Sequence, residues 1–77
     1  MARVRYFAAA REATGRDEER RSETTLGALR AAVSAEHPGL AGILPRCAVL
    51  VGGMRVDDDT PVGADELVDI LPPFAGG

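Results

Sequence analysis

The sequence contains no lysine and no tryptophan, and it has a single cysteine, Cys47, and a single histidine, His37. One cysteine excludes an intramolecular disulfide and a metal site built from several thiolates. No apolar run approaches the roughly 20 residues of a membrane-spanning helix, and the opening Met1–Arg5 lacks the apolar core of a signal peptide. We therefore expect a cytoplasmic protein that does not contact a membrane.

Positive charge is also scarce. The net charge is −3, and all nine basic residues are arginine. Nucleic-acid binding needs a basic face, which this balance opposes. Residues 1–46 carry eight arginines and six acidic residues, whereas residues 47–77 carry one arginine and six acidic residues. An acidic surface near the end of the chain would suit a partner with a basic surface.

The chain is short. Its 77 residues, of which 45% are hydrophobic and 27% charged, have the composition of one globular domain spanning residues 1–77. So little protein can hardly enclose a catalytic pocket of the usual size. The length therefore favours a protein that acts through a partner.

Hydrophobic spacing predicts the order strand, strand, helix, strand, short strand, strand. The helix is expected from Thr24 or Thr25 to about Glu36, and Pro38 ends it, which leaves His37 facing the negative helix end. Residues 8–15 fit either a turn of helix or a loop. The predicted strands are 3–7, part of the charged segment 16–23, 47–51, 54–56 and 67–71, and the loop 39–46 is expected to place Leu40, Ile43 and Leu44 in the core. One helix on one face of a mixed sheet of four to five strands makes an α+β domain.

Three short motifs have a chemical and a structural interpretation, and the structural one is favoured each time. Gly52-Gly53 beside an arginine could hold phosphate, but no helix follows it, so a hairpin turn with positive φ fits better. Asp57–Asp59 lacks the ligand spacing of a calcium loop and fits a solvated turn. Cys47 heads an apolar run and is expected in the core rather than as a nucleophile. We expect no bound metal and no bound cofactor.

The last seven residues, Leu71–Gly77, read Leu-Pro-Pro-Phe-Ala-Gly-Gly. Pro72 and Pro73 fix φ and favour a stiff, extended backbone that loses little entropy when a partner captures it. Gly76 and Gly77 could enter a slot too narrow for any side chain. An expression remnant would explain the glycines alone, but not the apolar residues that lead to them. The pattern predicts an extended, flexible tail over residues 72–77 that presents its C-terminal carboxylate.

The element order and this ending resemble the small subunits of molybdopterin synthase and the related ThiS-like sulfur carriers, which are ubiquitin-like β-grasp proteins. The resemblance covers essentially the whole chain. Besides the ending, it is carried by Val4–Ala8 with Arg11 and Glu12, by Thr25–Arg30, by Thr60–Val62 and by Asp65–Leu67. The Pro-Pro approach favours the molybdopterin branch over the thiamine carriers, and a carrier for cysteine synthesis remains an alternative. Arg55 departs from the pattern, because an apolar residue is expected there on the contact surface.

The resemblance implies a carrier without its own catalytic site. The Gly77 carboxylate would be adenylated by an enzyme similar to ubiquitin-activating enzymes, using ATP and Mg²⁺, and then converted to a thiocarboxylate. The large catalytic subunit of molybdopterin synthase, in a heterotetramer, would take the sulfur for the molybdenum cofactor. The residues expected to contact these partners are Phe7, Leu71, Pro72, Pro73, Phe74, Ala75 and Gly76.

Two other classes of protein with the same fold are alternatives to a sulfur carrier. A ubiquitin-like protein modifier would use the tail to form an isopeptide, and a regulatory β-grasp domain would ignore the tail. The absence of lysine argues against a modifier that builds chains on itself, and Gly76-Gly77 argues against a regulatory domain.

We predict that Gly76→Val, or one extra residue after Gly77, abolishes activation while the domain stays folded. A β-branched side chain adds volume to a slot sized for backbone, and one added residue moves the reactive carbonyl by up to ~3.5 Å. Pyrophosphate exchange and partner affinity, measured in parallel with the unaltered chain, test this. Normal exchange in both variants would show that the tail does not thread into the activating enzyme.

Overall fold

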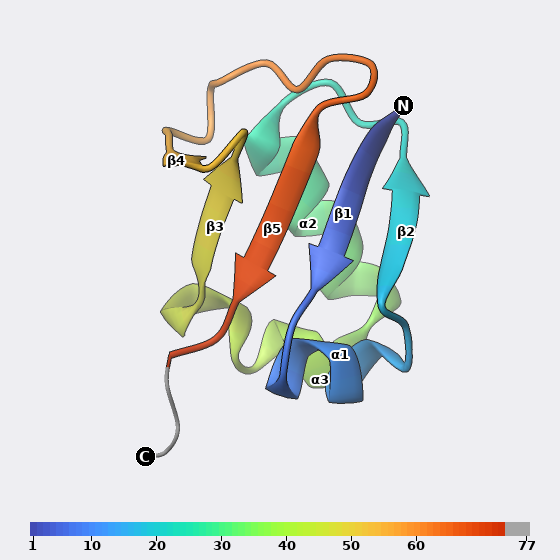
Figure 1. The fold of residues 1–77 in the computed structure, drawn as a ribbon. Coiled ribbons are helices and arrows are strands. Elements are labelled where there is room, and N and C mark those ends of the chain that lie inside the picture. Colours follow the sequence, from blue (N-terminus) through green and yellow to red (C-terminus); the bar gives the residue numbers. More distant parts are fainter. Residues whose placement is uncertain (74–77) are drawn as a thin grey trace.

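The computed structural model describes residues 1–73 of the chain. Five strands form one mixed sheet in the order β2-β1-β5-β3-β4, in which β1 and β5 are parallel and the other neighbours antiparallel (Figure 1). The strands are β1 (Ala2–Tyr6), β2 (Glu18–Arg21), β3 (Ala48–Val51), β4 (Met54–Arg55) and β5 (Leu67–Leu71). The helices are α1 (Ala9–Thr14), α2 (Leu26–Glu36), α3 (Pro38–Ala41) and the 3₁₀ turn η1 (Leu44–Arg46).

The core lies between the sheet and α2, which crosses behind it in Figure 1. Strand residues alternate, so every second side chain of β1, β3 and β5 is buried under the helix. The α2 stripe Leu26, Leu29 and Val33 meets them, as its spacing predicts. The buried strand residues are Ala2, Val4, Tyr6, Val49, Val51, Val68 and Ile70. The predicted α+β arrangement of a five-stranded mixed sheet on one main helix is confirmed. No helix within residues 1–73 is long and apolar enough to cross a membrane.

The packing at the start of α2 accounts for Gly27, although glycine disfavours a helix. Thr25 caps the helix, because its side-chain oxygen accepts a hydrogen bond from the Ala28 N–H at 3.2 Å. The N–H of Gly27 donates to the carbonyl of Asp58 at 2.9 Å. A Cβ at Gly27 would stand 3.0 Å from the Asp58 Cβ, so the close approach of the two segments favours glycine.

Several segments differ from the sequence-based expectation. Strand β1 covers Ala2–Tyr6 instead of 3–7, β4 ends at Arg55 instead of 56, and most of the segment 8–15, predicted as helix or loop, forms α1. The segment 39–46 is not a simple loop, because it contains most of α3 and all of η1. Its predicted core residues Leu40 and Leu44 are buried, and Ile43 packs beside them. Strand β3 begins at Ala48, one residue later than predicted. The Gly52-Gly53 turn has the predicted positive φ values, 57° and 83°.

The densely charged segment forms β2 because a polar cluster replaces apolar packing there. The buried carboxylate of Glu19 accepts a hydrogen bond from the Tyr6 hydroxyl and lies 2.9 Å from His37 Nε2. Arg21 makes paired contacts of 2.8–2.9 Å with Glu23 and 2.8 Å with Glu36. The His37 side chain therefore reaches across to β2, whereas its backbone N–H closes the end of α2 on the Val33 carbonyl.

The electrostatics of the cluster favour the ionised carboxylate of Glu19. Burial raises its pKa, but hydrogen bonds from Tyr6 and His37 and the charge of Arg21 outweigh burial, and the pKa is lowered. A folded-state pKa below the unfolded value stabilises the fold at neutral pH, and this contribution is lost as the pH falls through the folded pKa.

We predict that Glu19→Gln lowers the free energy of unfolding by about 1–3 kcal/mol at neutral pH, because the cluster loses its central charged acceptor. The difference between variant and unaltered chain should shrink as the pH falls below the usual glutamate range. Denaturant unfolding at several pH values checks this, with the exposed Glu12→Gln as a matched control. A loss of stability that is the same at every pH would contradict the electrostatic account.

Candidate functional site

The described chain ends at the margin of the sheet. Strand β5 runs between β1 and β3 and ends at Leu71, whose register partner is Ala48 (Figure 1). Pro72 and Pro73 follow, and because proline has no N–H they cannot extend the hydrogen-bonded ladder. The structure thus places Leu71, Pro72 and Pro73 at the end of the sheet where α1 and α3 lie, whereas the predicted site residues Phe74, Ala75, Gly76 and Gly77 lie outside the described residues.

A small groove lies beside the two prolines, which form part of its wall. Pro72 and Pro73 line a groove of about 140 Å³ together with Ala9 of α1, Ile43 and Arg46 of η1. These contacts come from three separate segments, so the sequence alone gives no sign of them.

The face of the sheet that α2 does not cover is the second part of the site. We call it the open face: it consists of the outward side chains of the strands and of Phe7, which follows β1. Its apolar members are half-buried or, for Phe7, 36% exposed. They are Phe7, Ala48, Leu50, Leu67 and Leu71.

An ion pair crosses the middle of the open face. Arg5 donates from Nε and Nη2 to the two carboxylate oxygens of Asp69 at 2.7 and 2.9 Å, and the two residues are register partners on β1 and β5. The Arg5 guanidinium lies 5.5 Å from the centre of the Phe7 ring. Hydrogen bonding to Asp69 raises the pKa of Arg5. The sequence analysis did not select Arg5 or Asp69, because only the strand register brings them together.

Arg55 also belongs to the open face. It is the register partner of Leu50 and is exposed on the edge strand β4. Arg55, which stands where the family pattern has an apolar residue, therefore lies on the expected contact surface.

The acidic excess of residues 47–77 does not lie around Pro72 and Pro73. Most of it lies in the connection from β4 to β5, at the opposite end of the sheet from Pro73 (Figure 1). The sixth acidic residue, Asp69, is paired with Arg5. Because β5 carries the chain about 17 Å from one end of the sheet to the other, nearness in sequence is not nearness in space. The acidic residues of the connection are Asp57, Asp58, Asp59, Asp65 and Glu66.

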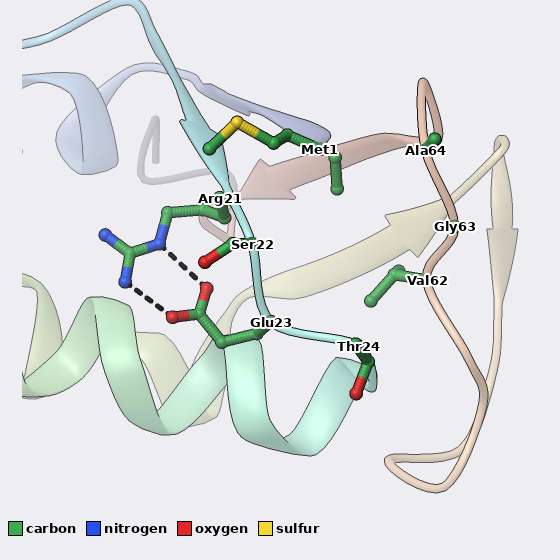
Figure 2. A pocket seen from close by; sticks show the side chains of 9 residues that line it. Met1, Arg21, Ser22, Glu23, Thr24, Val62, Gly63 and Ala64 are labelled. Carbon is green, nitrogen blue, oxygen red and sulfur yellow. Dashed lines mark hydrogen bonds and ion pairs between the residues drawn. The ribbon is translucent and has the colours of Figure 1, made fainter.

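A larger hollow at the other end of the molecule is unsuited to ligand chemistry. Figure 2 shows it between Met1, the segment Arg21–Thr24 and the segment Val62–Ala64. Its charged side chains, Arg21 and Glu23, are bonded to each other. The other polar side chains that line it are the hydroxyls of Ser22 and Thr24, and it offers no unpaired charged side chain among the residues drawn.

Two further groups were candidates for chemistry. Cys47 is half-buried, its thiol donates to the Ile43 carbonyl at 3.3 Å, and burial raises the pKa of the thiol. It therefore stays protonated, and it packs at the margin of the core rather than inside it.

Oxygen and nitrogen atoms of Glu19, Glu36 and His37 lie within 4.8 Å of one another, but the guanidinium of Arg21 already bonds Glu36 and approaches Glu19 at 3.5 Å. A metal ion would have to displace that cation.

A five-stranded mixed sheet on one main helix, with a central last strand leading to a Pro-Pro segment, defines a ubiquitin-like β-grasp fold. The model of the ThiS family matches residues 4–77, and this chain belongs to that family. Small carriers of this family are in general not catalytic themselves. No curated protein matches the sequence closely enough to count as a relative.

Solved structures agree with this assignment. Small archaeal modifier protein 1 from Methanosarcina acetivorans is similar at a TM-score of 0.87 and 21% identity, covering 99% of this chain and 95% of that one. The Haloferax volcanii HVO 2177 protein has a TM-score of 0.75 and 30% identity, covering 99% and 85%. A chain of the complex of subunits 1 and 2 of molybdopterin-converting factor from Helicobacter pylori has a TM-score of 0.75 and 27% identity, covering 99% and 97%.

The backbone next to Phe7 is strained. Ala8 has φ 49° and ψ −122°, a conformation that glycine adopts far more easily. The turn is closed by a hydrogen bond of 2.9 Å from the Ala10 N–H to the Phe7 carbonyl. Such strain costs of order 1–3 kcal/mol, and here it sets the path from β1 into α1.

We predict that Ala8→Gly raises the free energy of unfolding by roughly 1 kcal/mol, because relief of strain exceeds the added freedom of the unfolded chain. For a domain of this size the melting temperature should rise by about 4–8 °C. Ala31→Gly, at an exposed position of α2, is the matched control and should lower it. Thermal unfolding of the unaltered chain and the two variants measures these melting temperatures. A lower melting temperature for Ala8→Gly would contradict the proposed strain at Ala8.

Proposed function

We propose that this chain is a sulfur carrier and serves as the small subunit of molybdopterin synthase in molybdenum cofactor biosynthesis. The observation that carries the proposal is the position of β5. This strand is the central one of the five, it borders the open apolar face, and it leads through Pro72 and Pro73 to the last four residues. Four residues can extend at most about 14 Å beyond Pro73. A partner bound to the open face would therefore have the C-terminal carboxylate within reach.

The chemistry takes place on Gly77 and is supplied by the partners. A carboxylate is a poor electrophile, so an adenylating enzyme similar to ubiquitin-activating enzymes uses ATP and Mg²⁺ to form an acyl-adenylate and release pyrophosphate. Hydrosulfide, as the sulfur donor, then attacks the acyl carbon, the bond to AMP breaks, and AMP leaves behind a thiocarboxylate. The carrier supplies the tail and the docking face, and no acid, base or cofactor of its own.

The large catalytic subunit of molybdopterin synthase is the proposed acceptor of this sulfur, in a heterotetramer with the carrier. The Helicobacter pylori structure supports this, since it is a complex of subunits 1 and 2 of molybdopterin-converting factor and its matching chain is 27% identical to this one. Phe7, Leu71, Pro72 and Pro73 are the described residues proposed to meet the large subunit. Carriers for cysteine or thiamine synthesis would use the same tail with another acceptor.

A protein modifier is the second candidate. It is favoured by the similarity to small archaeal modifier protein 1 over nearly the whole chain. A modifier would join Gly77 to a lysine of a target protein. No arginine follows Arg55 and the chain has no lysine, so trypsin would leave the whole segment after Arg55 on that target lysine. Such branched peptides in digests of cellular protein would identify a modifier.

We predict that the chain gains one sulfur in place of one oxygen when it is incubated with its activating enzyme, ATP, Mg²⁺ and a sulfur donor. Intact-mass spectrometry measures the exchange, and omission of ATP is the control. Addition of the large subunit and the pterin precursor should return the carboxylate form. A carboxylate that stays unchanged beside an enzyme active on another carrier would refute the sulfur-carrier proposal.

A further inference from the structure

The open face carries an excess of arginine in a chain that is acidic overall. Strand alternation and register place four arginines and two carboxylates on this face. The arginines are Arg3, Arg5, Arg20 and Arg55, and the carboxylates are Glu18 and Asp69. The side of the molecule next to the tail thus has the opposite charge to the rest of the chain.

Only two of these arginines are already neutralised. Arg5 is paired with Asp69 at 2.7 Å, and Arg3 approaches Glu18 at 3.3 Å. Arg20 and Arg55 have no carboxylate partner within 4.0 Å among residues 1–73, and both are exposed. Their charge is therefore available to another molecule.

The two available arginines flank the apolar part of the face. Arg20 lies on β2 and Arg55 on β4, which are the two edge strands of the sheet. Four strand spacings of about 4.8 Å and an offset of two residues separate their backbones by about 20 Å. Leu50, Leu67 and Leu71 lie between them on β3 and β5.

We propose that the open face binds a protein partner whose contact surface has an apolar centre and two acidic patches about 20 Å apart, which pair with Arg20 and Arg55. The inference rests on the proposed function and specifies the partner surface that its docking face requires. Separated charges at the rim of an apolar contact steer the encounter and fix orientation more than they add affinity. Here the two arginines would hold the partner in one orientation relative to the C-terminal end of β5.

A protein fits this face better than a nucleic acid. The carboxylates of Glu18 and Asp69 lie on the same face and would repel a phosphate backbone. The apolar side chains between the arginines are mostly aliphatic, and Phe7 is the one aromatic ring of the open face within residues 1–73. Aliphatic surface suits the apolar side chains of a protein rather than stacked bases.

The test measures association rates for Arg20→Glu and Arg55→Glu, with the adenylating enzyme and the large subunit from the same organism as probes. Arg30→Glu is the matched control, because it makes the same change of net charge on α2, behind the sheet. Each open-face variant should associate about tenfold more slowly at low salt, and the control should change by less than about twofold. The differences should fade near ~0.5 M salt, where surface charges are screened. Melting temperatures establish that every variant is folded.

Equal rates for all three variants, with the unaltered chain forming a thiocarboxylate, would overturn this inference and leave the proposed function standing. No thiocarboxylate and no binding by the unaltered chain would overturn both. If the variants self-associate while each monomer binds the partner at an unchanged rate, the arginines serve only to keep the sheet edges from pairing with other copies of the chain. Binding of single-stranded RNA that depends on Arg20 and Arg55 would show that the face recognises phosphate instead of an acidic protein.

Discussion

The parallel pairing of β1 with β5 beneath α2 is the interaction on which the rest of the structure depends. It joins the first and last strands of the described chain, and the side chains of Val4, Val68 and Ile70 are fully buried there. The other strands are added on either side, β2 beside β1 and the β3–β4 hairpin beside β5. Since parallel strands end at the same edge of a sheet, the chain leaves β1 and β5 side by side. This is why Phe7, whose N–H donates to the Ile70 carbonyl at 3.2 Å, stands next to the start of the tail.

The same pair of strands organises the open face. On the side away from α2, Arg5 and Asp69 are held opposite each other, and a partly exposed ion pair of this kind adds little stability because solvent screens it. Its larger effect is geometric, because it holds the guanidinium over the Phe7 ring and cancels the charge at the middle of the face. The remaining positive charge is left at the two edges, on Arg20 and Arg55.

The sequence predicts those features that depend on local pattern. Alternation identifies β1, β3 and β5, the spacing of Leu26, Leu29 and Val33 identifies α2, and Gly52-Gly53 identifies the hairpin. Strand β2 has no apolar alternation, because buried hydrogen bonds take the place of apolar contacts, and it could be expected only from the need of β1 for a neighbour. Helix α3 is too short to show a period, although Leu40 still marks its buried side.

The candidate site is less accessible to sequence reasoning, because it is assembled from distant segments. Pro72 and Pro73 are visible as a motif, but their groove with Ala9, Ile43 and Arg46 depends on where η1 packs. The charge around the site is misjudged for the same reason. Acidic residues that are near the tail in sequence belong to the β4–β5 connection at the far end of the sheet.

The open face and the tail have different physical roles. Alanine and glycine make up the last three residues and have little apolar surface to bury, so the end of the tail beyond Phe74 can contribute little affinity of its own. Affinity must then come from the open face, where aliphatic side chains and flanking arginines are held by a rigid sheet. In the proposed function, this separation would serve a carrier that must engage one protein for activation and another for delivery. The face would form and break contacts by moderate affinity and charge, and the same small tail would serve both partners without being reshaped for each.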